Sequence, residues 1–209
     1  MSTATRAPVT PKGEATRAYL LRTAARVFAE RGYVAATQAE LIAAAGLTKG
    51  AFYFHFSSKA ALALAVLQDQ KSRWLAQISE ATSAEPTAAG QLRALLPAML
   101  NLVAEDPSAW SVTRLSHELA ADPQVGRQVG QATREWIAFI AEIVRRGQAE
   151  GSLRAGLDPE AVATVLIGAF DGLKSLVDVL DPGDGATGLF PERARTLLAL
   201  LEAPLFQPG

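Results

Sequence analysis

The chain has 209 residues, a formal net charge of −1 and 49% hydrophobic residues, so it can bury the core of one large domain or two small ones. The absence of cysteine excludes disulfides and thiolate metal sites, and it favours a reducing cytoplasm. No apolar stretch approaches the roughly 18 residues of a membrane helix, and no apolar segment follows a basic start, so neither membrane insertion nor secretion is expected.

Charge is distributed unevenly along the chain. Residues 1–59 carry eight basic and three acidic side chains, whereas the remainder carries 12 basic and 18 acidic ones. A basic end on an acidic body allows one end alone to approach phosphates. Ordinary surface variation would produce the same asymmetry, so the charge distribution supports phosphate binding only in combination with the motifs in the same segment.

The N-terminal residues divide into a tail and a helix. Residues 1–13 are small, polar and interrupted by proline, which predicts a disordered basic tail. A helix is predicted from Glu14 to Glu30. Its buried face should carry Tyr19, Leu20, Ala24, Val27 and Phe28.

Residues 37–59 contain two short helical patterns joined by a tight turn. Thr37 is followed three residues later by Glu40, which predicts a capping box at the start of the first pattern. Gly46 lies where that helix must end, since a residue without a Cβ is favoured there. Thr48 then caps the second pattern. This order of elements predicts a helix-turn-helix, whose second helix enters the major groove of DNA.

The rest of the chain is predicted to be helical. Ser57 and Ser58 should cap a long helix that leaves the first domain. The predicted helices span about 59–81, 92–103, 109–120, 123–150, 160–180 and 191–201. No period-two alternation occurs, so we expect an all-α fold, with a three-helix DNA-binding domain at 14–58 and a ligand-binding and dimerisation domain at 59–209.

The run from Phe28 to Lys59 resembles the DNA-binding domain of tetracycline-repressor-type (TetR family) regulators. The matching positions are Phe28, Gly32, Tyr33, Thr37, Ala45-Gly46-Leu47, Thr48-Lys49-Gly50, Tyr53, His55-Phe56 and Lys59. The segment Lys49–Phe56, with Leu62, Ala63, Ala65 and Val66 after it, is similar to the γ-butyrolactone-receptor branch of this family. Two positions depart from the family pattern: Gln38 replaces an apolar residue, and Ala60 replaces an acidic one.

Residue types and the resemblance together predict which residues contact DNA. Thr37 and Thr48 add hydroxyls to helix N-termini, where phosphate binds. Lys49 can reach a phosphate or a guanine edge, and Gly50 and Ala51 are small enough for the helix to approach the bases closely.

The resemblance implies that Tyr53, His55 and Lys59 contact the DNA backbone, which positions the protein without reading sequence. Gln38 is a further candidate for a hydrogen bond to adenine or phosphate. The remaining aromatic residues of the second helix, Phe52, Phe54 and Phe56, are expected to pack the core.

The body contains a wide apolar stripe around Trp136, which from the residues alone is as consistent with a packed core as with a cavity. The resemblance implies a ligand cavity there and matches Trp136 to a tryptophan associated with the signal molecule in butyrolactone receptors. We therefore predict ligand contacts by Met99, Trp110, Trp136, Ile140, Phe170 and Gln70, with Thr113, His117 and Thr133 as further polar candidates. A mostly apolar pocket of this kind suits a small lipophilic lactone or furan.

The penultimate helix is apolar on two faces, one of them built from unusually small residues. Such a helix must be covered on both sides, either inside a monomeric bundle or by a second copy of the chain. The resemblance favours a homodimer. The predicted interface consists of Val165, Gly168, Ala169, Gly172, Leu197 and Leu201.

No catalytic, metal-binding or cofactor-binding pattern is evident, because the chain has two histidines, no GxSxG sequence and no clustered acidic and histidine ligands. We therefore expect a cytoplasmic, homodimeric repressor that releases a double-stranded DNA operator when it binds a small lipophilic effector, such as a γ-butyrolactone-type signal. The alternatives are a multidrug-sensing repressor or an activator of the same family, or a helical ligand-binding module without DNA function.

Overall fold

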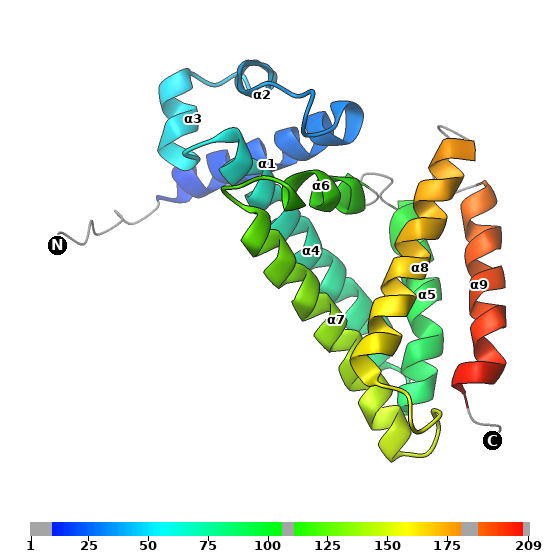
Figure 1. Ribbon diagram of the computed structural model, residues 1–209. Helices are drawn as coiled ribbons and strands as arrows, with labels where there is room; N and C mark the ends of the chain where they lie inside the picture. The colour runs from blue at the N-terminus through cyan, green and yellow to red at the C-terminus, as the bar shows by residue number, and fades with distance from the viewer. Residues whose placement is uncertain (1–9, 106–110, 181–187, 207–209) are drawn as a thin grey trace.

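The computed structural model describes residues 10–105, 111–180 and 188–206, and within them the regular structure is helical (Figure 1). The helices are α1 (Pro11–Arg31), α2 (Gln38–Ala44), α3 (Lys49–His55), α4 (Lys59–Ser83), α5 (Ala88–Glu105), α6 (Ser111–Ala120), α7 (Gly126–Ala149), α8 (Pro159–Leu180) and α9 (Leu189–Leu205). The predicted all-α class, with an N-terminal helix-turn-helix domain before a helical body, is confirmed.

The helix boundaries follow local signals in the sequence. Ser58 caps α4 as predicted, with its Oγ accepting a hydrogen bond from the Ala61 N–H at 3.0 Å. The first helix begins earlier than predicted, because the Thr10 hydroxyl accepts from the Gly13 N–H and Pro11 occupies the first turn. Residues 11–13, which the sequence assigns to a disordered tail, are therefore helical.

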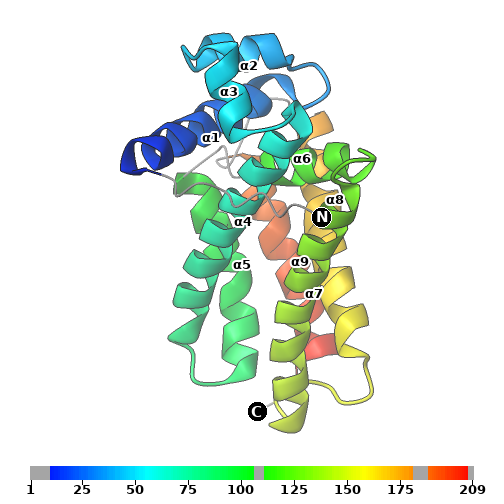
Figure 2. The same ribbon diagram turned by 90° about the vertical axis from the view of Figure 1, so that its left-hand side faces the viewer.

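Helices α1, α2 and α3 form one end of the molecule, here called the head, and α4 runs from it into the body (Figures 1 and 2). The body consists of α5, α7, α8 and α9 with the distal half of α4. Helix α6 lies between the head and the body and contacts α1, α4 and α7.

Two clusters of buried side chains fill the interior. One joins the head to the first half of α4 and includes Leu115 and Leu119 of α6, so packing continues past the domain boundary predicted at residue 58. The other lies in the body around Ile78, Ile140 and Phe170. Helix α6 contributes to the first cluster and also borders the body. A shift of α6 would therefore change the packing in the head.

Among the described residues, no single helix is long and apolar enough to span a membrane. Helices α3 and α4 reach that length and composition only when taken together, and they are bent by 55° relative to each other.

Candidate functional site

The helix-turn-helix is held by the caps that the sequence predicts. The Thr37 hydroxyl accepts from the Glu40 N–H at 3.2 Å, and Glu40 accepts from the Thr37 N–H at 2.8 Å, which completes the capping box. The Thr37 N–H and the Thr37 hydroxyl both donate to the Glu40 carboxylate, and these two bonds, with the nearby Arg31 guanidinium, lower the pKa of Glu40. Gly46 has a φ of 61° and ends α2, as an achiral residue can do without strain.

Helix α3 presents a polar face to solvent and an aromatic face to the core. The Thr48 hydroxyl caps α3 by accepting from the Ala51 N–H at 3.2 Å. Lys49, Gly50 and Tyr53 are exposed, as DNA contacts would require. Three phenylalanines of this segment are predicted to pack the core, but only two of them do so. Phe52 and Phe56 are buried, but Phe54 is 77% exposed, so its core assignment is wrong.

His55 is half-buried at the end of α3, with its ring edge-on to Phe54. Partial burial and the neighbouring Arg17 lower the pKa of His55. The imidazole is therefore neutral at pH 7, and one ring N–H remains as a donor.

The structure does not place Gln38 as an exposed DNA-contacting side chain. Its amide nitrogen is buried and has no hydrogen-bond partner among the described residues. Gln38 thus occupies the position under α2 where the family usually has an apolar residue, and its amide points into the protein. The prediction that Gln38 reaches DNA disagrees with this conformation, because the amide would first have to rotate out of the head.

Lys59, the predicted contact to the DNA backbone, is engaged within the protein. Its ammonium donates to the carbonyl oxygens of Tyr33 at 2.8 Å and Ala36 at 2.9 Å, and it lies 4.3 Å from the centre of the Tyr33 ring. Lys59 therefore ties the start of α4 to the α1–α2 loop. A phosphate contact, which stays a prediction, would use the one remaining N–H.

Helix α6 holds the same loop from the other side. The Glu118 carboxylate accepts from the Tyr33 N–H at 2.5 Å and from the Val34 N–H at 3.2 Å. Arg114 donates to the carbonyl oxygens of Phe28 at 2.8 Å and Ala29 at 2.5 Å in the last turn of α1, where the Phe28 carbonyl also accepts from the Gly32 N–H. Through these bonds, α6 holds the head in position and acts as a bracket for it.

The bracket continues into the α6–α7 loop. The Tyr33 hydroxyl donates to Asp122 at 2.8 Å, which lowers the pKa of the carboxyl and, together with burial, raises the pKa of the phenol. Sequence reasoning missed Arg114, Glu118 and Asp122, because each acts on backbone or side chains about 85 to 89 residues earlier in the chain.

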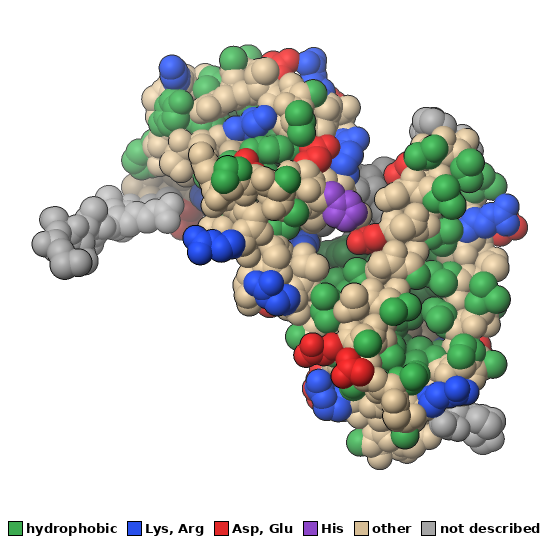
Figure 3. All heavy atoms as spheres, in the orientation of Figure 1, with side chains coloured by type: hydrophobic (Ala, Val, Ile, Leu, Met, Phe, Trp, Pro, Cys, Tyr) green, Lys and Arg blue, Asp and Glu red, His purple; other side chains and the backbone are tan. Residues whose placement is uncertain are grey.

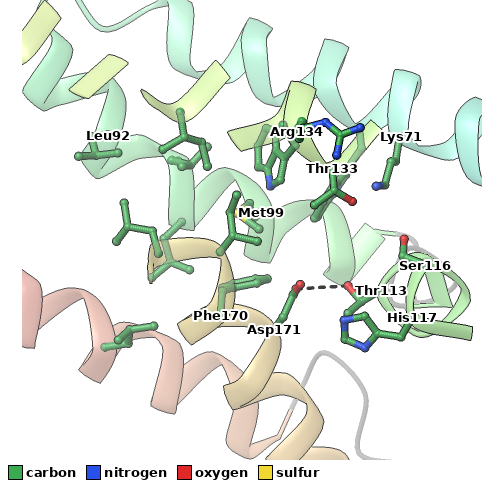
Figure 4. A pocket seen from close by; sticks show the side chains of 18 of the residues that line it. Lys71, Leu92, Met99, Thr113, Ser116, His117, Thr133, Arg134, Phe170 and Asp171 are labelled. Carbon is green, nitrogen blue, oxygen red and sulfur yellow. Dashed lines mark hydrogen bonds between the residues drawn. The ribbon is translucent and has the colours of Figure 1, made fainter. Parts of the chain in front are cut away.

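A cavity of about 510 Å³ lies in the body, bordered by α4, α5, α6, α7, α8 and α9 (Figure 4). Four of the predicted ligand-binding residues, Met99, Trp136, Ile140 and Phe170, are on its wall. Thr113, His117 and Thr133 are also on the wall.

The other predicted ligand residues do not line the cavity or cannot be placed. Gln70 is not among the residues that line the cavity, and its side-chain oxygen is buried without a hydrogen-bond partner among the described residues, so the cavity lends no support to its predicted ligand contact. Trp110 lies outside the described residues. Trp136 stacks on Phe139 with ring centres 5.5 Å apart and lies 5.8 Å from the Trp74 ring. A molecule in the cavity would therefore lie against an aromatic wall that includes Trp74.

One end of the cavity is polar. Thr113 donates to Asp171 at 3.4 Å, and His117 of α6 and Lys71 of α4 face the same region (Figure 4). Partial burial raises the pKa of Asp171 and lowers that of Lys71, although the two groups attract each other. Sequence reasoning missed Lys71 and Asp171, which lie on α4 and α8 and border the same cavity only in the folded body.

We expect Asp171→Asn to raise the melting temperature at neutral pH. Burial raises the Asp171 pKa despite the opposing effects of His117, Thr113 and Lys71. A carboxyl whose folded-state pKa lies above its unfolded-state pKa adds stability at low pH and loses it as the pH rises through the folded-state pKa. The excess stability of the variant should therefore grow as the pH rises from about 4, the ordinary pKa of the unfolded-state carboxyl, through the raised folded-state pKa.

Thermal unfolding followed by circular dichroism measures this difference. Asp69→Asn is the control, because the Asp69 carboxylate lies on the surface of α4 beside Arg73. A stability difference for Asp171→Asn that shrinks as the pH rises would contradict the assignment of Asp171 as a carboxyl destabilised by burial.

The outer face of α8 and α9 is apolar and exposed (Figure 3). Val165 is 62% exposed and Val179 is 75% exposed, and Gly168 and Gly172 lie on the same side of α8 with open space around them. On α9, the predicted interface residues Leu197 and Leu201 are half-buried, and their place in a dimer stays a prediction. Leu197 and Leu201 line the cavity, and it is Leu200 that is exposed.

Comparisons with known proteins agree with both parts of the structure. The family described as bacterial regulatory proteins, tetR family, matches residues 20–66, and the C-terminal domain of BetI-type transcriptional repressors matches residues 88–202.

Individual relatives have about one residue in three identical to this chain in the aligned regions. The chain is 32% identical over 130 residues to the transcriptional activator FasR of Mycolicibacterium smegmatis, covering 62% of this chain and 59% of the relative. It is 31% identical over 163 residues to the A-factor receptor protein of Streptomyces griseus, covering 77% of this chain and 54% of the relative. A solved structure that concerns control of antibiotic production by bacterial hormones superposes with a TM-score of 0.74 at 32% identity, covering 92% of this chain and 98% of that one.

Proposed function

Because the chain belongs to the TetR family of bacterial regulatory proteins, which are DNA-binding regulators and not enzymes, we propose that it is a homodimeric repressor that a small lipophilic effector releases from its operator. The observation that carries the proposal is the position of α6. Its residues Thr113 and His117 line the cavity, while Arg114 and Glu118 hold the head.

The proposed DNA contacts lie on the exposed side of the helix-turn-helix. Lys49 and Tyr53 extend from α3, and Gly50 leaves room for the helix to approach the base edges. The Thr48 hydroxyl caps α3 by accepting a hydrogen bond, so it retains its O–H to donate to a phosphate. The Thr37 hydroxyl also donates to Glu40 at 2.9 Å, and it would have to release that carboxylate before donating to a phosphate. Ala51 and His55 are only half-exposed, so their contacts would need close approach of the DNA.

The proposed dimer forms through the exposed apolar face of α8 and α9. Exposed large apolar residues such as Val165, Leu176, Val179 and Leu200 are uncommon on the surface of a monomer when they share one face. Two copies related by a two-fold axis would bury this face in a four-helix interface. The dimer would place its recognition helices for successive major grooves, about 34–36 Å apart.

In the proposed mechanism the effector fills the cavity and displaces α6. Because Arg114 and Glu118 bond to the end of α1 and to the α1–α2 loop, the displacement would turn the head and change the spacing of the two recognition helices. Linkage then requires that operator DNA lower the affinity for the effector by the same factor. Similarity to the A-factor receptor supports a γ-butyrolactone-type signal as the effector class.

The test is binding of the purified chain to duplexes selected from a random library, measured by fluorescence anisotropy over a range of salt concentrations. The proposal requires a palindromic site, affinity that falls steeply with salt, and release by lipophilic extracts or synthetic γ-butyrolactones. Failure to select any site would remove the proposal. Release by none of the compounds would remove the effector class while leaving the DNA-binding function.

We expect Tyr53→Ala to weaken binding to operator and to unrelated DNA by a similar factor, of about 5- to 20-fold. The reason is that a phenol contacting phosphate positions the protein but reads no base. Tyr19→Ala is the matched control, since Tyr19 is equally exposed but lies on α1. A change in the preferred base at any operator position would show that Tyr53 reads sequence instead.

A further inference from the structure

The cavity has two chemically different ends, and Figure 4 shows them on opposite sides of Met99 and Phe170. Leu92 of α5 lies at the apolar end. Lys71, Thr113 and His117 lie at the other end, where α6 borders the cavity. A ligand that matches this division has an apolar tail directed into the body and a polar group directed toward α6.

The two charges at the polar end are not paired with each other. Among the described residues, Lys71 makes no hydrogen bond or ion pair, and Asp171 accepts only one bond, from Thr113 at 3.4 Å. Both are half-buried on the cavity wall, so each retains bonding capacity in a partly desolvated site. The ammonium offers donors, and the carboxylate offers an acceptor.

The charges on the wall discriminate between types of head group. A quaternary ammonium would face Lys71 and Arg134 and could donate no hydrogen bond to Asp171. A carboxylate would be attracted by Lys71 and Arg134, but it could donate no hydrogen bond to Asp171, the one acidic residue on the described wall, and would repel it. A neutral group with both a carbonyl oxygen and a hydroxyl can accept from Lys71 and donate to Asp171 at the same time.

We propose that the effector is a neutral amphiphile whose alkyl chain lies against α5 and α7 and whose head, with a carbonyl acceptor and a hydroxyl donor, lies between Lys71 and Asp171 beside α6. This assignment rests on the proposed function for its biological meaning, and on the cavity alone for its chemistry. It places the polar group of the effector against Thr113 and His117 of α6. These residues lie within one helix turn of Arg114 and Glu118, which bond to the head of the protein.

The experiment uses ten-carbon probes that differ only in the head group, each below its micelle concentration. They are 1-monodecanoylglycerol with ester carbonyl and hydroxyls, methyl decanoate with a carbonyl only, decanoate as the anion and decyltrimethylammonium as the cation. Binding to the full-length protein is followed by tryptophan fluorescence, because Trp74 and Trp136 line the cavity. We expect 1-monodecanoylglycerol to bind at least about tenfold more tightly than the other three.

Two variants test the residues. Asp171→Asn should reduce the affinity for 1-monodecanoylglycerol about tenfold and leave that for methyl decanoate within about twofold, because only the first donates to Asp171. Lys71→Met should weaken both esters. Asp69→Asn, on α4 outside the cavity, is the control and should change neither.

The outcomes separate the two proposals. Tightest binding of decanoate or decyltrimethylammonium, or equal binding of all four probes, would overturn the head-group assignment, as would an Asp171→Asn variant that binds 1-monodecanoylglycerol normally. The proposed function has its own readout, the release of selected operator DNA. If 1-monodecanoylglycerol binds with the expected selectivity but no bound lipophile releases DNA, the coupling through α6 fails and the assignment of the cavity stands.

Discussion

Replacing Gly168 or Gly172 with leucine is expected to leave the chain folded but to separate the proposed dimer and weaken operator binding by at least about 100-fold. A Cβ at either glycine meets no atom within 4 Å inside the chain, so the added side chain should not disturb the monomer. In a close four-helix interface the same side chain would overpack, at a cost of about 1–3 kcal/mol per site. A separated monomer binds one half-site only. It therefore loses the increase in affinity, on the order of 10²–10⁴, that comes from binding two half-sites at once.

Sedimentation velocity and operator titration measure the two effects. Ala138→Leu places the same side chain on the exposed face of α7 and serves as the control, with no change expected in either measurement. A wild-type chain that sediments as a monomer at micromolar concentration would remove the dimer, and a Gly168→Leu variant with normal assembly would place the interface elsewhere.

Glu118→Ala is expected to lower the free energy of unfolding by about 1–3 kcal/mol and to weaken operator binding. The Glu118 carboxylate accepts from the N–H groups of Tyr33 and Val34, and its loss leaves those donors unpaired at a part-buried loop. The α1–α2 loop would then be held only by Lys59 and Asp122. Since α6 would then hold the head only through the bonds of Arg114 to α1, effector-induced release should fall more than effector binding does.

Urea unfolding gives the stability change, and effector titrations with and without DNA give the coupling. Glu142→Ala is the control, because Glu142 forms only an exposed pair with Arg145 on α7, and such a change is expected to stay within about 0.5 kcal/mol. Full effector-induced release by Glu118→Ala would show that the signal reaches the head by another route, such as α4.

The elements of the fold could be predicted because their signals are local. Thr37, Thr48 and Ser58 each cap a helix through a bond to an N–H three residues later, so sequence spacing alone identifies the helix start. Apolar periodicity likewise placed the helices of the body to within a few residues, and the spacing of Thr48, Lys49, Gly50 and Tyr53 placed the exposed face of α3.

Side-chain direction within short or uniformly apolar helices could not be predicted. Phe52 and Phe54 both suit a core, but two residues along a helix is more than half a turn, so only one of them can face inward. The run from Leu197 to Leu201 has apolar residues on two faces, and packing against the cavity turned Leu197 and Leu201 inward and left Leu200 outside. Burial against neighbouring helices decides these cases, and sequence periodicity does not report it.

The tertiary structure alone decided the polar contacts that connect the parts. Residue type and the family resemblance predict that Lys59 contacts DNA, but its ammonium donates to two carbonyl oxygens 23 and 26 residues earlier in the chain. Asp171 and Glu118 lie on different helices, and their bonding partners Thr113 and Tyr33 are 58 and 85 residues away in the chain. Lys71 borders the same cavity as Asp171 from a third helix. Hydrogen bonds and charges act over a few ångströms in space, so their partners become identifiable only when packing of the apolar faces has placed α4 against α6 and α8 against α7.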